Sequence, residues 1–250
     1  MTGTQAIDRA AELVALVVHA ERPRSFGELV GSTGLAKSTG SRLLRALERH
    51  QLLERDDEGY RPGALFAVYA ARHEPLAELE RVAAPVLRKL GELTGETVNL
   101  AVPRGRSVVQ LAQVDSTFML GATNWVGVDV PAHCTALGKV CYAFDALALP
   151  TGLLDRRTPA SARSGAELRR QCGLVREQGY AITRSELEPG LDAVAAPVFG
   201  VAGRLVAAVS VSGPDVRMAD QLDDIGRLLI AHTTTLSGLL GHQPGAEGAA

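Results

Sequence analysis

Residues 25–63 constrain the fold more than any other segment, because they carry the pattern of a winged helix-turn-helix. A short helix beginning at Ser25, a turn that contains Gly34, a basic second helix and a charged hairpin follow one another here. In this arrangement the second helix enters the major groove of DNA. We therefore predict a DNA-binding domain over residues 1–63, and the longer remainder of the chain must have another task.

Local signals support each part of this motif. Ser25 and Glu28 have the three-residue spacing of a capping box at a helix start. Gly34 can adopt the left-handed backbone of a tight interhelical turn. Gly40 lies inside the second helix, where glycine costs about 1 kcal/mol relative to alanine, so we expect a close helix contact there. The first helix has a predicted core-facing stripe of Ile7, Ala10, Leu13, Val14, Val17 and Val18.

The outward face of the second helix is basic. Taken alone, such a face would be read as a solvated helix surface, but the turn before it and the hairpin after it favour contact with DNA. The planar guanidinium of Arg42 suits a guanine edge, and Lys37 suits a phosphate. The tip of the following hairpin is acidic, so we assign phosphate contact to the arginines that flank it. The predicted DNA-binding residues are Ser25, Lys37, Ser38, Thr39, Ser41, Arg42, Arg45, Arg55 and Arg61.

Composition excludes several classes of protein. The formal net charge of −2 gives no global attraction to nucleic acid, so DNA affinity must come from local charge. No apolar run is long enough to span a membrane, and charged residues interrupt the N-terminal segment, so we expect a cytoplasmic protein without a signal peptide. The cysteines Cys134, Cys141 and Cys172 form no C-x-x-C pair and are expected to be buried, reduced thiols.

The rest of the chain mixes helical and strand patterns, which predicts an α+β fold with a largely antiparallel sheet. Pro75 fits the first turn of a helix, and Pro85 is expected to break or kink that helix. We predict a linker helix over residues 64–76, an effector-binding domain over 77–241 and a disordered tail over 242–250. Within the domain, strands are predicted at 97–102, 107–114 and 205–212, and helices at 135–145, 165–178 and 222–240.

Two polar residues in the last predicted strand indicate a small-molecule site. Ser210 and Ser212 are two positions apart, so both side chains point to one face of the sheet. Together they could bind a carboxylate or another small oxyanion, or they could be a buried pair bonded to backbone carbonyls. Both alternatives remain open from the residues alone.

Other chemistry finds little support. His133 and Cys134 are neighbours on an extended segment and point to opposite faces, so they cannot pair as base and nucleophile. Lys139 follows a glycine as in a phosphate-binding loop, but the upstream glycine spacing is missing. No spacing of histidines and cysteines indicates a metal site, and we expect neither a cofactor nor an enzyme.

Three blocks of the sequence together resemble the IclR family of transcriptional regulators. They are TGLAKSTGSRLLRALE with the following LLER and YRPG, then VPAHCTALGKVCYA at 130–143, and the segment that begins GYAITRSELEPG at 179–214. The resemblance covers nearly the whole chain, and the blocks occur in the family's order. Gly40 and Ser41 stand where the family more often has bulkier residues, so base preference cannot be transferred.

The resemblance implies a winged helix, a linker helix and a GAF-like effector domain, assembled as a homodimer or a dimer of dimers on palindromic operator DNA. It implies a regulator of small-molecule metabolism, with repression favoured over activation and an organic or aromatic acid as a candidate effector. Thr183 and Ala193 replace an acidic residue and a cysteine of glyoxylate-responsive relatives, which argues against glyoxylate and suggests a roomier or more apolar effector. Carried over by position, the effector-binding residues are Met119, Ala122, Val130, Ala136, Leu137, Thr183, Leu191, Ala193, Ser210 and Ser212.

Two other hypotheses compete with a ligand-responsive transcription factor. An enzyme tethered to DNA would need a nucleophile and base that the sequence does not supply. A constitutive architectural DNA-binding protein would leave the large second domain without a task.

Overall fold

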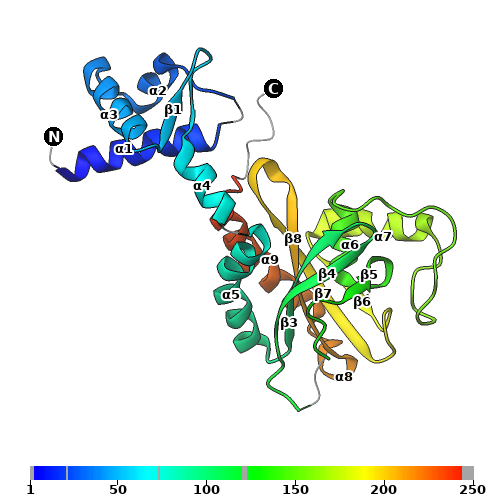
Figure 1. Cartoon of the computed structure of the whole chain (residues 1–250). Coiled ribbons are helices and arrows are strands. Elements are labelled where there is room, and N and C mark those ends of the chain that lie inside the picture. Colours follow the sequence, from blue (N-terminus) through cyan, green and yellow to red (C-terminus); the bar gives the residue numbers. More distant parts are fainter. Residues whose placement is uncertain (1–2, 21, 73, 120–122, 244–250) are drawn as a thin grey trace. The chain divides into compact units, whose positions relative to one another are not determined.

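A computed structural model of the 250-residue chain describes residues 3–20, 22–72, 74–119 and 123–243. The chain forms two compact units, Met1–Ala77 and Glu78–Ala250 (Figure 1). The predicted disordered tail at 242–250 lies mostly outside the described residues.

The first unit has the element order of a winged helix-turn-helix. Its core contains Leu13 and Val17 of the first helix, but Ile7 and Val18 are 70% and 39% exposed. The predicted stripe is therefore wrong at its two ends, because the neighbouring elements pack only on the middle of that helix. The elements are α1 (Gly3–Val18), α2 (Phe26–Thr33), α3 (Lys37–Arg49), β1 (Leu53–Arg55), β2 (Tyr60–Pro62) and α4 (Ala64–Arg72).

The helix-turn-helix signals are confirmed in detail. The Ser25 hydroxyl accepts from the Glu28 amide, and the Glu28 carboxylate accepts from the Ser25 amide at 2.8 Å, which completes the capping box. Gly34 ends α2 with a φ of 62°. A Cβ atom at Gly40 would lie 2.7 Å from a methyl group of Val30, so the expected close helix contact is present.

Two helices occupy the region where a single linker helix was predicted. After α4, the helix α5 (Pro75–Thr94) begins at Pro75 as expected. It continues through Pro85, so the expectation of a break is wrong. Proline removes one backbone hydrogen bond, whereas buried residues on both sides of Pro85, from Leu79 to Leu90, hold α5 against the sheet.

The second unit is built on a six-stranded antiparallel sheet with the order β5-β4-β3-β8-β7-β6, which confirms the α+β prediction. The strands and helices with counterparts among the predicted elements begin within one residue of the expected positions. They are β3 (Thr97–Arg104), β4 (Ser107–Val114), α6 (Ala136–Ala143), α7 (Gly165–Gln178), β8 (Leu205–Pro214) and α9 (Leu222–Leu239). The elements that were not predicted are β5 (Asp129–Pro131), β6 (Ala181–Arg184), β7 (Leu191–Phe199), α8 (Asp215–Met218) and the short 3-10 helices η1 (Ala132–Cys134) and η2 (Val201–Gly203).

Each face of this sheet packs against different helices. Along β3, Val98 and Leu100 belong to the core shared with α5 and α9. Ala101 belongs to a second core on the opposite face, shared with α6 and α7. This division follows from the strand pleat, in which successive side chains point to opposite faces.

Candidate DNA interface and ligand cavity

The basic residues predicted to contact DNA lie on the outer face of α3. Lys37, Arg42, Arg45 and Arg49 are exposed, while Gly40, Leu44 and Leu47 face the core. Ser38 is also exposed, and Thr39 and Ser41 are half-buried. The helix therefore presents cations and hydroxyl groups outward along the face that the sequence predicted.

The predicted contacts of the wing have partners within the protein. Arg61 forms ion pairs with Asp56 and Glu58 at the acidic tip, and the Arg55 guanidinium lies 5.5 Å from the centre of the Tyr60 ring. Ser25 is committed to the capping box. Phosphate contact by Ser25, Arg55 or Arg61 remains a prediction. To bind a phosphate, each side chain would have to leave its present partner within the protein or contact both at once.

Glu28 also links the cap to the basic residues that precede it. The Arg22 guanidinium donates to Glu28 at 2.6 Å, and together with the Ser25 amide it lowers the pKa of the Glu28 carboxyl to about 2. The carboxylate therefore stays charged at neutral pH, where it holds the start of α2.

A cavity lies between the sheet and the beginning of α6. The space between its lining residues amounts to about 500 Å³, part of which is open to solvent. Most of the predicted effector residues line it together: Val130, Ala136, Leu137, Thr183, Leu191, Ala193, Ser210 and Ser212. Met119 is fully exposed and does not line this cavity, and Ala122 lies outside the described residues.

Five further residues line the cavity, and the sequence interpretation missed them: Asn99, Gln110, Trp125, Thr135 and Leu187. The amide side chains of Asn99 and Gln110 interrupt apolar strands, which is a signal that could have drawn attention to them. The Asn99 side-chain nitrogen donates to the Ser212 hydroxyl at 3.5 Å. Ser210 and Ser212 are both buried, but within the described residues neither side chain donates to a backbone carbonyl.

The start of α6 forms one wall of the cavity. The Thr135 hydroxyl accepts from the Gly138 amide at 3.2 Å and so caps the helix. A Cβ atom at Gly138 would lie 2.0 Å from the Ala132 carbonyl oxygen, which explains the glycine of the G-K pair by close approach of η1. Ala136 and Leu137 are the first residues of α6, where backbone N–H groups lack acceptors within the helix.

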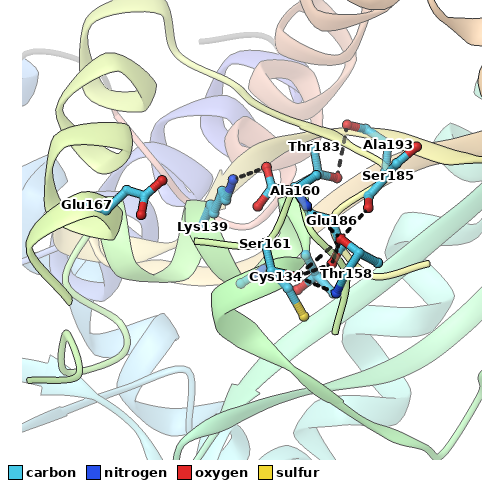
Figure 2. Close-up of polar contacts among 12 residues, drawn as sticks. Cys134, Lys139, Thr158, Ala160, Ser161, Glu167, Thr183, Ser185, Glu186 and Ala193 are labelled. Carbon is cyan, nitrogen blue, oxygen red and sulfur yellow. Dashed lines mark hydrogen bonds and ion pairs between the residues drawn. The ribbon is translucent and has the colours of Figure 1, made fainter. Parts of the chain in front are cut away.

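Lys139 belongs to a buried ion pair beside the cavity. Its ammonium group lies 2.5 Å from the Glu186 carboxylate, and both side chains are buried (Figure 2). Burial raises the pKa of Glu186, while the Lys139 charge opposes that shift. The Glu186 backbone carbonyl also accepts from the hydroxyls of Ser161, at 2.7 Å, and Thr158. Lys139 therefore anchors the segment around Glu186 to α6, and we find no phosphate-loop role for it.

The thiols are buried and free, as predicted. Burial raises the pKa of Cys134 to about 11 and that of Cys141 to about 12. The His133 ring lies 2.6 Å from the Asp155 carbonyl oxygen and not against Cys134. These protonated thiols are unsuited to nucleophilic catalysis.

Comparison with known proteins agrees with this architecture. The model of the IclR helix-turn-helix domain matches residues 6–57, and that of the bacterial transcriptional regulator IclR C-terminal domain matches residues 75–237. The chain belongs to the IclR family. These domains are those of transcriptional regulators and not of enzymes, which contradicts the competing hypothesis of an enzyme tethered to DNA.

Relatives within the IclR family extend over most of the chain. The regulator BhcR of Paracoccus denitrificans is 31% identical over 87% of this chain and 80% of its own length. The repressor AllR of Salmonella paratyphi A is 28% identical over 97% of this chain and 92% of its own. A solved IclR-type structure from Silicibacter sp. TM1040 has a TM-score of 0.79 at 26% identity, covering 98% of this chain and 99% of that one.

The described residues were also searched for membrane-spanning helices and metal sites. Among them, no helix is both long and apolar enough to cross a membrane. No group of three or more His, Cys, Asp or Glu side chains in the described ranges could hold a metal ion.

Proposed function

We propose that this protein is a cytoplasmic repressor whose affinity for operator DNA changes when a small metabolite binds beside α6. The observation that carries the proposal is the combination of a basic recognition helix with a cavity lined by convergent polar groups in the other unit. In this proposal residues 1–63 bind DNA and residues 77–241 bind the effector.

A small organic acid suits the wall of the cavity formed by α6. Ala136 and Leu137 contribute free backbone N–H groups at the positive end of that helix, and Ser210 and Ser212 add hydroxyl donors. No charged side chain lines the cavity within the described residues. A single carboxylate would therefore be held by backbone amides and hydroxyls, without a cationic partner.

We further propose that the protein acts as a homodimer or a dimer of dimers on a palindromic operator. A two-fold assembly presents two copies of α3 to two half-sites. Coupling of about 1–3 kcal/mol between effector and DNA is typical of such switches. The resemblance to regulators that share this domain order supports the proposal.

The decisive experiment measures binding of the full-length protein to DNA upstream of its own gene. Its affinity is compared with that for scrambled DNA over a salt series, and the titration is repeated with a panel of organic acids. We expect tight, salt-sensitive and sequence-selective binding that one acid weakens. Equal affinity for both DNAs at every salt concentration would contradict the proposal for this DNA, and an unaltered affinity with every acid would contradict effector control.

A further inference from the structure

Two amide side chains in the cavity have oxygen atoms without a hydrogen-bond donor among the described residues. They are Oδ1 of Asn99 and Oε1 of Gln110, and their side chains belong to residues that are only 3% and 6% exposed. Both residues line the cavity. A buried acceptor without a partner costs free energy, so a ligand that donates to these two atoms would gain affinity.

The sheet places these two residues on the face that forms the cavity floor, with both oxygens buried. Asn99 lies on β3 directly beside Ser210 of β8, and Gln110 lies on the neighbouring β4, opposite Ala101. One N–H of the Asn99 amide donates to the Ser212 hydroxyl at 3.5 Å, while its Oδ1 atom receives no hydrogen bond from the described residues. An amide oxygen can only accept, so a ligand that binds Oδ1 must present a donor.

The remaining walls do not satisfy these acceptors. Leu187 and Leu191 offer apolar surface, and no lysine or arginine lines the cavity within the described residues. Donor groups are present on the hydroxyls of Thr183, Ser210 and Ser212, but none of them donates to either amide oxygen. An alkyl or aromatic acid would place hydrocarbon against both amide oxygens and leave them unpaired in a desolvated site. A ligand with hydroxyl or amide N–H groups would pair with them.

We propose that the effector is a small acid that carries at least two hydroxyl groups, which donate to Asn99 and Gln110. This inference rests on the proposed effector role of the cavity and specifies the class of its ligand. Asn99 and Gln110 are then specificity-determining residues that select hydroxylated acids over plain alkyl and aromatic acids.

Trp125 provides a direct readout, because it is the only tryptophan of the chain and it lines the cavity. We would titrate the full-length protein, without DNA, with three matched pairs of acids: glycerate and propionate, threonate and butyrate, gluconate and hexanoate. Benzoate represents the aromatic acids. We expect at least one hydroxylated acid to change the Trp125 fluorescence with a Kd at least about tenfold below that of its alkyl partner.

Variants distinguish specific recognition from a structural effect. Gln110→Leu and Asn99→Leu should each weaken the hydroxylated acid about tenfold or more while leaving or improving the alkyl partner, so the ratio of the two Kd values falls towards one. A side chain with only a structural role would weaken both acids equally. The melting temperature of each variant and the emission maximum of Trp125 verify that the effector unit is folded.

The inference is overturned if the alkyl acids or benzoate bind as tightly as the hydroxylated acids, if no hydroxylated acid binds at millimolar concentrations, or if the variants retain the wild-type ratio. Because this assay contains no DNA, its outcome is independent of operator binding. Loss of operator binding with retained discrimination between the acids would refute the proposed repressor and leave the ligand class standing.

Discussion

Arg42 is the residue on which direct reading of DNA sequence can be tested most clearly. Its side chain is exposed on α3, one turn from the helix start, where recognition helices meet base edges. We predict that Arg42→Ala costs about 1–3 kcal/mol on the operator and less on random DNA, measured by fluorescence polarisation at one salt concentration. Equal losses on both DNAs would make Arg42 a phosphate contact.

A matched control for this substitution is Arg88→Ala. Arg88 is an exposed helical arginine on α5, outside the winged helix. The control variant should bind operator and random DNA with the wild-type affinities. A loss similar to that of Arg42→Ala would show that total charge, and not position on α3, determines DNA affinity.

Because of the buried thiols, we expect the stability of the folded protein to depend on pH in the alkaline range. In the unfolded chain a thiol ionises near pH 9, whereas the pKa of Cys134 is about 11 and that of Cys141 about 12 in the folded protein. The unfolded state therefore loses protons first, so the free energy of unfolding should fall as pH rises from about 9 to 12. Urea titrations across this range, with a cysteine-free variant as control, measure the effect.

The same thiols should be chemically inert in the native protein. At pH 8, Cys134, Cys141 and Cys172 are buried and protonated, so iodoacetamide should modify them slowly. The protein in denaturant should react at all three. Rapid stoichiometric modification of the folded protein, detected by mass spectrometry, would contradict this burial.

Single residues also show where sequence reasoning reached its limit. The common direction of Ser210 and Ser212 was predictable, because the pleat requires it. The partners of these serines were not, because Asn99 approaches Ser212 from a strand more than a hundred positions earlier in the chain. Pairing between β3 and β8 depends on the whole sheet, and no local pattern encodes it.

At the scale of elements, the junction of η1 and α6 is the most sterically constrained part of the cavity wall. We predict that Gly138→Ala costs about 1–3 kcal/mol and disturbs the cavity, because the added Cβ would meet the Ala132 carbonyl at 2.0 Å. Urea unfolding followed by Trp125 fluorescence measures the loss. Unchanged stability would mean that η1 can move away without cost.

Gly173→Ala is the matched control within the same unit. Gly173 lies inside α7, and a Cβ there would meet nothing within 4 Å. Alanine should therefore stabilise the unit by up to about 1 kcal/mol through helix propensity alone. If Gly138→Ala lowers and Gly173→Ala raises the free energy of unfolding, the cost at Gly138 comes from close packing and not from a general effect of replacing a helical glycine.

Helices and strands were predictable from the sequence where residues within the element or at its ends determine its limits. Ser164 and Gly179 bound α7 with a side-chain cap and a left-handed residue, and the predicted limits of this helix hold. By contrast, β7 was missed because it is buried on both faces and lacks the alternation of a half-exposed strand. The break predicted at Pro85 is absent, because packing of α5 in the core outweighs the local effect of proline on the helix.

At the scale of the whole molecule, the proposed function requires reciprocal coupling. If an acid that binds beside Trp125 weakens operator binding by a given factor, operator DNA must weaken binding of that acid by the same factor. We expect a factor of about 5–150, read from Trp125 fluorescence titrations with and without operator DNA. Scrambled DNA is the control. Unequal factors would mean that the two ligands do not act on one equilibrium.

The alternation of side chains along β3 and β8 has a consequence for how such a protein can evolve. Asn99 and Ser210 face the cavity, whereas their chain neighbours Val98 and Val209 pack in the core shared with α5 and α9. Mutation can therefore redesign one surface of the sheet while natural selection preserves the other. Point mutations at alternate positions could therefore change which effector the cavity binds, while the core between the sheet and α5 and α9 stays unchanged.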